Sequence, residues 1–265
     1  MNTMKKILKK ISKLAFGKKY SQPLFELLYK ISIKGMNFGD SETEDSGEKY
    51  VLEYLKRKSD TENFVIFDAG ANLGQYATLA NKVFSDKAYI YSFEPGKETF
   101  SQMSKNTSTI KNIQRYNFAL GSFDGEATLN YDKEGSGLAS VYERKLEHAN
   151  ISLNTKENIE IKTIDSVYLS NNITHIDFLK MDVEGHELEI LKGAGDVLKD
   201  KKVSALQFEF GGANIDSRTY FQDFFYLLKE NYRIYRVLQD GLKEIKNYSE
   251  LQEIFTTVNY FAELK

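Results

Sequence analysis

The stretch that decides the fold is Phe64-Val65-Ile66-Phe67-Asp68-Ala69-Gly70-Ala71-Asn72-Leu73-Gly74. A short apolar run ends in an acid and then breaks into a loop of small residues with glycines four positions apart. The next residues, Gln75-Tyr76-Ala77-Thr78-Leu79-Ala80, have the composition of a helix. A strand, a tight turn and a helix in this order are typical of the point in an open α/β sheet where a nucleotide-like ligand lies against a helix N-terminus.

Asp68, the acid ahead of the first glycine, influences which kind of ligand this turn can bind. Dinucleotide-binding folds use a Gly-x-Gly-x-x-Gly pattern, because backbone amides must approach a pyrophosphate closely. Here only Gly70 and Gly74 are present, and the Asp68 carboxylate would repel a pyrophosphate. The same carboxylate suits a cation, and S-adenosylmethionine carries an ammonium and a sulfonium group. The loop alone leaves both classes of ligand open.

The end of the second expected strand favours an adenosine ligand. Tyr89-Ile90-Tyr91-Ser92-Phe93-Glu94-Pro95 ends in an acid, and an acid at this place can accept hydrogen bonds from both ribose hydroxyls. Pro95 is one of only two prolines in the chain and fixes the backbone directly after that acid. A solvated charge at the end of a strand is the structural alternative for Glu94.

Strand-like and helix-like segments alternate along the chain, which favours an α/β fold with a mostly parallel sheet and helices on both faces. Seven strands are expected at residues 64–68, 88–94, 113–118, 178–182, 205–210, 233–238 and 258–264. Helices are expected at residues 21–33, 48–58, 75–84, 97–105, 187–199 and 219–231. No helical pattern separates the last two strands, so we expect them to form an antiparallel pair at one edge.

Residues 121–165 interrupt this alternation ahead of the fourth strand. Residues 127–131 and 159–163 have the pattern of two extra strands, and a loop with Gly135, Ser136 and Gly137 lies between them. An insertion here would lie near the carboxyl ends of the strands, where it could cover a substrate. A plain β extension that packs on the edge of the core is the open alternative.

Composition narrows the class of protein. The chain has 265 residues, no cysteine and three histidines, which excludes disulfides, thiolate zinc sites and thiol catalysis and makes a histidine-rich metal centre a poor fit. Seven lysines and no acid occur in residues 1–20, so the rest of the chain carries nine more acids than bases to reach the net charge of −2. So acidic a body is a poor match for nucleic acid, and we predict no nucleic-acid partner and a cytoplasmic location.

The basic N-terminus also has a helical period. Apolar residues recur at Met4, Ile7, Leu8, Ile11, Leu14 and Ala15, with the lysines on the other face. We predict an amphipathic helical arm over residues 1–40, one main domain over residues 41–265, and a polar boundary near Gly35–Gly47. Residues 1–20 could lie on an anionic membrane at its inner face, or they could pack on the domain or on a second subunit.

Several of these segments together resemble one known family. They are Asp68-Ala69-Gly70-Ala71-Asn72-Leu73-Gly74, Phe93-Glu94-Pro95, Ala119-Leu120-Gly121, Thr163-Ile164-Asp165-Ser166-Val167, Leu179-Lys180-Met181-Asp182-Val183-Glu184-Gly185-His186-Glu187 and Leu191-Lys192-Gly193-Ala194. In order and spacing they resemble the FkbM family of S-adenosylmethionine-dependent methyltransferases over about residues 48–265. The resemblance implies a Rossmann-like class I methyltransferase fold, O-methylation and S-adenosylmethionine as the cofactor.

The resemblance also implies which residues bind that cofactor. By position, Asp68, Gly70, Asn72 and Gly74 would surround its methionine part, and Glu94 would hold its ribose. The segment Asn117-Phe118-Ala119-Leu120 would flank the adenine, so Asn117 and Ala119 complete the expected cofactor set. No metal site is assigned.

The turn after the fourth strand is where the transferred methyl group should lie. Holding the acceptor hydroxyl in line with the methyl group would supply much of the acceleration, and a base that takes its proton would add about 10²–10⁴-fold. The turn is crowded with ionisable side chains, and Glu209 ends the next strand. We take as candidate catalytic residues Asp182, His186 and Glu209.

Other interpretations of this turn stay open. Glu184 could brace the turn, Lys180 could be a structural counter-charge, and His186 could face solvent. A metal could be held by the same crowded carboxylates. For the acceptor we expect a small molecule or a glycan, as in polysaccharide biosynthesis, with an oligomer left open. A nicotinamide-dependent oxidoreductase and a non-catalytic scaffold of the same fold are the rival functions.

Overall fold

The computed structural model describes residues 16–39 and 46–265 of the chain. The chain divides into two units, Met1–Gly39 and Asp40–Lys265. In the first unit a 3-10 turn, η1 (Lys19–Ser21), leads into the helix α2 (Gln22–Gly35). The period expected from Met4 to Ala15 lies outside the described residues. No helix of the described residues is long and apolar enough to cross a membrane.

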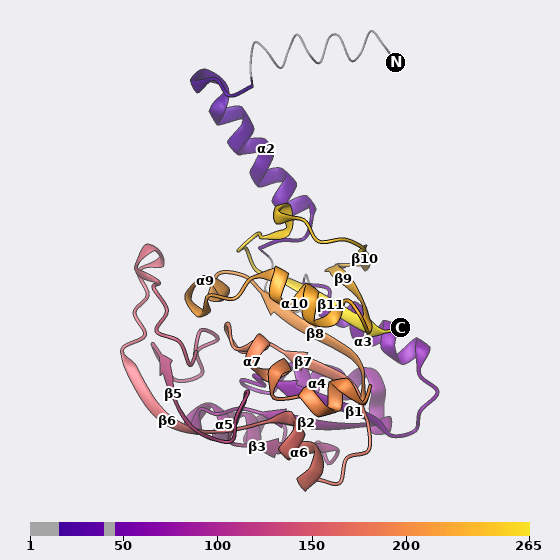
Figure 1. Ribbon diagram of the computed structural model, residues 1–265. Coiled ribbons are helices and arrows are strands. Elements are labelled where there is room, and N and C mark those ends of the chain that lie inside the picture. The colour runs from indigo at the N-terminus through magenta and orange to yellow at the C-terminus, as the bar shows by residue number, and fades with distance from the viewer. Residues whose placement is uncertain (1–15, 40–45) are drawn as a thin grey trace. The chain divides into compact units, whose positions relative to one another are not determined.

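The second unit is built on an eight-stranded sheet (Figure 1). Its strands are β1 (Phe64–Ala69), β2 (Ala88–Phe93), β3 (Ile113–Tyr116), β7 (Ile176–Met181), β8 (Val203–Phe210), β9 (Tyr232–Leu238), β10 (Gly241–Ile245) and β11 (Val258–Leu264). They lie in the order β10-β9-β11-β8-β7-β1-β2-β3. Without β10 this is the strand order of the class I methyltransferase fold, so the predicted fold class is confirmed. The prediction of seven strands missed β10, which is short and carries two charges.

One end of the sheet is antiparallel. β11 lies between β8 and β9 and runs opposite to both, while β10 pairs with β9 and forms the edge. The expected antiparallel pairing of the last two predicted strands is therefore confirmed. The prediction that this pair forms the edge of the sheet is wrong, because the β9–β10 hairpin adds one more strand outside the pair.

Four main-domain helices fall where the sequence predicts them: α3 (Glu48–Lys58), α4 (Gln75–Phe84), α5 (Lys97–Asn106) and α10 (Phe221–Leu228). The helix expected over residues 187–199 is instead two, α7 (Glu187–Lys192) and α8 (Gly195–Lys199). At the break, the backbone of Gly193 packs so closely that an added Cβ would lie 1.9 Å from the Gly121 carbonyl oxygen. The sequence does not predict α6 (Ile164–Ser170) and α9 (Ala213–Ser217), which are too short to show a helical period.

The inserted region forms a second, three-stranded sheet in the order β4-β6-β5. The two expected extra strands are present as β5 (Gly125–Tyr131) and β6 (Thr155–Lys162), which pair antiparallel, and β4 (Ala119–Leu120) pairs with β6. A long loop therefore connects β5 to β6, and it contains the 3-10 turn η3 (Glu147–Ala149).

Each strand of the main sheet contributes to two cores, because successive side chains point to opposite faces. One face packs on α3 and α4, with Ile66, Phe178 and Ala205 among its buried residues. On the other face Phe208 stacks on Phe224 of α10, with ring centroids 4.4 Å apart. Each fully buried Ile, Leu or Phe side chain stabilises the fold by about 1.5–3 kcal/mol. Because many such side chains pack on both faces of the sheet, the ends of its strands are held in fixed positions.

Candidate functional site

The sheet face that packs on α3 and α4 turns polar at the carboxyl ends of the parallel strands. Ile66 and Phe178 lie in the apolar core, and two positions further along the same strands come Asp68 and Lys180. Asp68 pairs with Lys180 across β1 and β7, and Lys180 pairs with Gln207 across β7 and β8. The two-residue period thus brings polar side chains from neighbouring strands to one edge of the sheet, where ligands bind in folds of this kind.

The glycine loop after β1 forms the tight turn that its sequence predicts, with backbone angles that the structure adds. Gly70, Asn72 and Gly74 all have positive φ angles, of 77°, 46° and 83°. An added Cβ on Gly70 would lie 1.8 Å from the carbonyl oxygen of Asp182, so only glycine fits between the two strand ends. Gly74 is the N-cap of α4 and packs on Thr107, away from the cavities described below.

Glu94 is tied to the loop by backbone hydrogen bonds. Its side chain is 7% exposed, and its two oxygens accept hydrogen bonds from the Asn72 amide at 3.0 Å and the Gly96 amide at 2.9 Å. Burial raises the pKa of Glu94 to about 7. Each carboxylate oxygen has a second lone pair, so the group can still accept hydrogen bonds from a ligand.

The two residues expected near the adenine have different surroundings. Ala119 and Leu120 line a cavity together with Glu94. The Asn117 side chain instead donates hydrogen bonds to the carbonyl oxygens of Glu94 and Pro95, both at 2.9 Å, and lies outside the cavity lining. Asn117 therefore braces the turn after β2.

Asp68 is fully buried, with 0% of its surface exposed. Its carboxylate oxygens accept no hydrogen bond from the described residues, and the ammonium group of Lys180 lies 3.5 Å from one of them. The same ammonium group lies 3.4 Å from an oxygen of Asp182. The nearby acids raise the pKa of Lys180, so this side chain is the counter-charge of both aspartates.

Two neighbouring cavities form one cleft over this edge of the sheet. The first, of about 70 Å³, lies on the side of Glu94, Pro95 and Ala119. The second, of about 440 Å³, extends toward α3 and β11 and is lined by polar residues that include Glu48, Lys180, Glu209 and Asn259. Five residues line both cavities: Gly70, Asn72, Gly137, Asp182 and Glu184.

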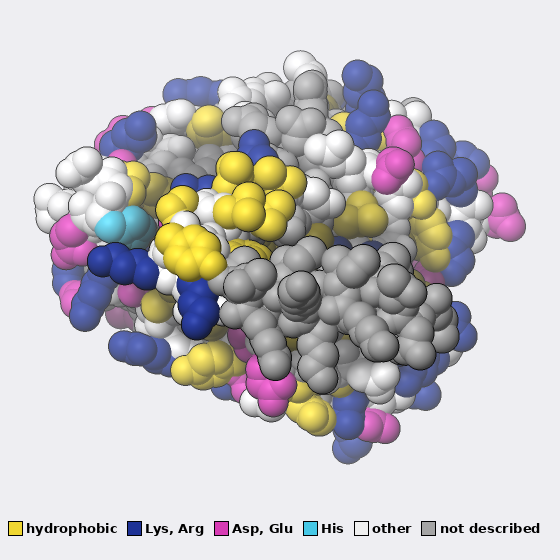
Figure 2. Space-filling model, turned by 90° about the horizontal axis from the view of Figure 1, so that it is seen from above, with side chains coloured by type: hydrophobic (Ala, Val, Ile, Leu, Met, Phe, Trp, Pro, Cys, Tyr) yellow, Lys and Arg dark blue, Asp and Glu magenta, His cyan; other side chains and the backbone are white. Residues whose placement is uncertain are grey.

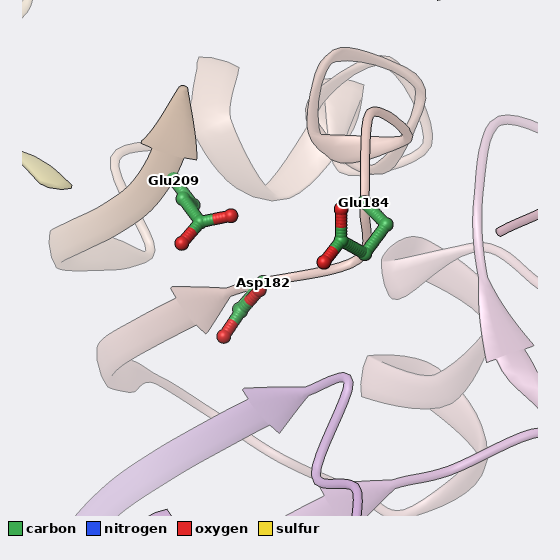
Figure 3. Close-up of side chains that lie close together, drawn as sticks. All are labelled: Asp182, Glu184 and Glu209. Carbon is green, nitrogen blue, oxygen red and sulfur yellow. The ribbon is translucent and has the colours of Figure 1, made fainter. Parts of the chain in front are cut away.

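Three acids meet where the cavities join. Asp182 follows β7, Glu184 lies two residues later, and Glu209 lies near the end of β8, with their carboxylates turned toward one another (Figure 3). One oxygen from each lies within 4.8 Å of the other two. Burial and the neighbouring acids raise the pKa of Glu184 to about 8 and that of Glu209 well above its ordinary value. The structure thus brings together two of the three predicted catalytic residues, Asp182 and Glu209.

The third, His186, lies on the other side of the cleft. It lines the first cavity, and its Nδ1 is 3.1 Å from the Tyr142 hydroxyl. Its Nε2 is buried without a hydrogen-bond partner among the described residues, close to Gly121. Burial lowers the pKa of His186 to about 4, so the ring is neutral at neutral pH.

The loop between β5 and β6 covers the junction of the cavities. Ser140 donates a hydrogen bond to the Glu184 carbonyl oxygen at 2.8 Å, and Arg144 forms ion pairs with Glu184 and Asp216. Gly137 lines both cavities. Of the two interpretations of the insertion, the geometry therefore favours a cover over the ligand cleft.

Sequence reasoning missed several residues of the second cavity, among them Glu48, Tyr76, Arg144 and Asn259. For Asn259 a signal was available, because an amide inside the apolar run of β11 is unusual. Its side chain accepts a hydrogen bond from Gln207 at 3.0 Å. Glu48 and Arg144 reach the site from distant parts of the chain, and no local pattern marks them.

Residues 68–235 match the methyltransferase FkbM domain family, which is more than half of the chain. The chain belongs to the FkbM methyltransferase family. The resemblance seen in its motifs is thereby confirmed, and the match includes the glycine loop, Glu94 and the Asp182–Glu187 turn.

Curated relatives of this FkbM chain are methyltransferases. Hexuronic acid methyltransferase AglP from Haloferax volcanii is 29% identical over 168 residues, which are 62% of this chain and 64% of that protein. Methyltransferase 1 from Beauveria bassiana is 29% identical over 147 residues, 49% of this chain and 58% of that protein. The chain thus spans about three-fifths of the length of the curated relatives it matches.

Solved structures were compared as well. A SAM-dependent methyltransferase from Aquifex aeolicus is similar over 88% of this chain and 97% of that chain, with 14% identity and a TM-score of 0.46. At this level of similarity, the fold assignment rests on the strand order and on the family match.

Proposed function

We propose that this FkbM protein is an S-adenosylmethionine-dependent methyltransferase that methylates a hydroxyl group of a sugar, glycan or glycolipid. The observation that carries the proposal is the cleft of two joined cavities. One side presents Glu94 and apolar residues, the other presents a set of acids, and Gly70, Asn72 and Asp182 line both. The residues expected to bind adenosine and the residues expected to carry out methyl transfer therefore lie on different sides of the cleft. The two sides meet at Gly70, Asn72 and Asp182.

The residues of the first cavity fit the cofactor. Glu94 would accept hydrogen bonds from the ribose hydroxyls, and Ala119 and Leu120 would contact the adenine. Gly70 and Asn72 would lie against the methionine part. When bound, S-adenosylmethionine supplies an electrophilic methyl group next to a positively charged sulfur.

Asp68 would act on the cofactor mainly as a positioning residue. It lines neither cavity, but it holds Lys180, which lines the second one. Lys180 is thereby fixed as a cation that can face the cofactor's carboxylate. Gly74 and Asn117 would support the loop and the turn from behind without touching the ligand.

Asp182 and Glu209 are the groups best placed to accept the proton of the acceptor hydroxyl. As the hydroxyl oxygen bonds to the methyl carbon and the carbon–sulfur bond breaks, its proton would pass to one of these carboxylates. Burial and the neighbouring acids raise the pKa of Glu209, which makes its carboxylate a stronger base than an exposed one. His186, with its lowered pKa and its place in the first cavity, is the weaker candidate.

The polar lining of the second cavity supports an acceptor rich in hydroxyl groups. Glu48, Gln75, Thr257 and Asn259 offer hydrogen-bond donors and acceptors there. A relative that is named for its action on a hexuronic acid supports the sugar class. The nicotinamide-dependent alternative finds no support in the family match, and the scaffold alternative predicts that no cofactor binds.

We also propose that the protein is cytoplasmic and that its N-terminal arm binds the inner face of an anionic membrane. Large apolar side chains of α2 are exposed, among them Leu24, Leu27 and Ile31, and Lys30 and Lys34 lie on the same helix. On the face drawn in Figure 2, hydrophobic side chains gather beside lysine and arginine side chains. Apolar and basic residues together favour an anionic lipid surface.

Transfer of a labelled methyl group to a panel of sugars, glycosides and glycolipids tests the proposed function. We expect labelled product with at least one hydroxyl-bearing acceptor and a loss of about 10²-fold or more in kcat for Asp182→Asn or Glu209→Gln. Each variant should keep its affinity for S-adenosylhomocysteine within a few fold. A product methylated on nitrogen or carbon, or full activity in both variants, would contradict the proposal.

A further inference from the structure

We infer that Asp182, Glu184 and Glu209 bind a divalent cation such as Mg²⁺, Mn²⁺ or Ca²⁺ in the second cavity. The geometry of the three carboxylates fits such an ion. One oxygen from each lies within 4.8 Å of the others, and two ligands on one cation at about 2.0–2.6 Å each can be no more than about 4–5 Å apart. The close-up in Figure 3 shows that the three side chains lie close together.

The acidic side chains around this space outnumber the basic ones. Four acidic side chains line the second cavity, and the basic side chains lining it are Arg144 and Lys180. Lys180 is shared between Asp68 and Asp182, and Arg144 is shared between Glu184 and Asp216. Glu209 has neither a hydrogen-bond nor an ion-pair partner among the described residues. A cation bound by all three acids would offset their mutual repulsion.

Two buried polar groups near the trio Asp182, Glu184 and Glu209 each have an atom without a partner among the described residues. Glu187 is 1% exposed; one of its oxygens accepts hydrogen bonds from the Val183 and Gly185 amides, and the other has no partner among the described residues. Its charge acts on Glu184 and Glu209, so it lies beside the trio. The Tyr76 hydroxyl is buried in the lining of the same cavity and is also without a described partner. The Tyr76 hydroxyl, which lines the cavity, can bind water held by a cation, whereas Glu187 lines neither cavity.

The carboxylate oxygens of Asp182, Glu184 and Glu209 determine which kind of cation can bind. The trio offers only carboxylate oxygens, and the nearest histidine in the turn, His186, lines the other cavity. Oxygen ligands favour hard cations such as Mg²⁺, Ca²⁺ and Mn²⁺ over softer ions that prefer nitrogen and sulfur.

The inferred cation would change which acceptors the cavity can take, a consequence that rests on the proposed methyltransferase function. Without it, the excess of acids would repel a sugar acid. With it, the oxygens of a sugar could complete the coordination, including those of an acidic sugar, and a bound hydroxyl would pass its proton more readily to the oxygen of Asp182 or Glu209 that does not bind the cation. The cation would therefore both orient the acceptor and widen its class.

Titration of chelator-treated full-length protein with Mn²⁺, by calorimetry and by the electron paramagnetic resonance signal of free Mn²⁺, tests the inference without cofactor or acceptor. We expect one Mn²⁺ per chain and a loss of affinity of about tenfold or more in Glu209→Gln, because cation affinity follows the number of charged ligands. Glu126→Gln, an exposed acid on β5, is the matched control and should bind like the wild type.

Binding absent up to about 10 mM Mn²⁺, or equal in wild type and Glu209→Gln, would overturn the inference. If Glu209→Gln does not fold by circular dichroism, Asp182→Asn takes its place, and competition of Mg²⁺ and Ca²⁺ for the Mn²⁺ site of the wild type gives a second reading. S-adenosylhomocysteine binding without Mn²⁺ binding would overturn only this inference. Mn²⁺ binding without S-adenosylhomocysteine binding would support it and contradict the proposed function.

Discussion

The Lys180 ammonium group lies 3.5 Å from an oxygen of Asp68, and the two residues are register partners on β7 and β1. Both side chains are almost completely buried, at 3% and 0% exposure. The ion pair therefore joins β1, which leads into the glycine loop, to β7, which leads into the Asp182–Glu187 turn. Removing one partner would leave a buried carboxylate without a counter-charge.

Lys180→Met should therefore destabilise the protein by about 3–5 kcal/mol, the usual effect of breaking a buried ion pair on one side. Urea denaturation at constant pH measures it. The control is Lys192→Met, which removes an exposed pair with Glu189 and should change the free energy of unfolding by less than about 1 kcal/mol. Equal changes in the free energy of unfolding for the two variants would show that the Lys180–Asp68 ion pair does not stabilise the fold as a buried ion pair should.

The free energy of unfolding should fall as the pH rises, because burial disfavours the ionised form of a carboxyl group. Burial raises the pKa of Glu48 from 4.5 to about 7, so the folded protein holds this proton more tightly than the unfolded chain. The resulting stabilisation is fully present below about pH 4.5 and is lost as the pH rises through about 7. For this group alone it amounts to at most about 3 kcal/mol.

Unfolding by urea at a series of pH values from about 5 to 8 measures this slope. In Glu48→Gln, whose side chain cannot ionise, the fall in unfolding free energy should be smaller than in the wild type by the Glu48 contribution. An identical slope in both proteins would mean that Glu48 is not the proton-binding group that the structure indicates.

Cofactor affinity should depend on pH through Glu94. Its pKa of about 7 means that its carboxylate forms across the neutral range, and the ionised form is the better hydrogen-bond acceptor for ribose hydroxyls. The affinity for S-adenosylhomocysteine should rise between about pH 6 and pH 8 in the wild type. In Glu94→Gln it should be lower by about 1–3 kcal/mol at the upper pH, with a flatter profile. A variant that binds as tightly as the wild type would exclude Glu94 as a cofactor ligand.

Gly70→Ala should damage both the loop and the cofactor site. A methyl group there would meet the Asp182 carbonyl oxygen at 1.8 Å, and the φ angle of 77° disfavours any other residue. We expect a loss of at least about 2 kcal/mol of stability together with loss of S-adenosylhomocysteine binding. Gly195→Ala, whose Cβ would meet no atom within 4 Å, is the control and should keep both properties.

The arm proposal makes a prediction about lipid binding. The full chain should sediment with vesicles that contain anionic lipid, and less so as salt is added. A chain that lacks residues 1–20 should bind less, because seven lysines are lost. If the two chains sediment alike, those residues do not contact the membrane.

The sequence was most informative where a local pattern reports on local structure. The ends of the expected strands placed Asp68, Glu94, Asp182 and Glu209 at one edge of the sheet, and the structure agrees. The glycine loop was expected to form a tight turn, and its positive φ angles agree with that. These features follow from steric limits on a few consecutive residues, so the local sequence is enough to predict them.

Other parts of the site depend on contacts between distant segments. Glu48 of α3 and Arg144 of the inserted loop reach the second cavity only because the sheet order brings them there. His186 was expected beside the reacting group because of its place in the turn. The positive φ of Glu184 and Gly185 turns the chain so that it lies in the first cavity instead. Such turns depend on single backbone angles that the pattern of residue types does not determine.

The most direct test of the central claim is a calorimetric titration of the full-length protein with S-adenosylhomocysteine and, separately, with NAD⁺. We predict one molecule of S-adenosylhomocysteine bound per chain and no measurable binding of NAD⁺, because the loop has two glycines where pyrophosphate-binding loops have three. No binding of S-adenosylhomocysteine, or binding of NAD⁺ with equal or higher affinity, would contradict the account.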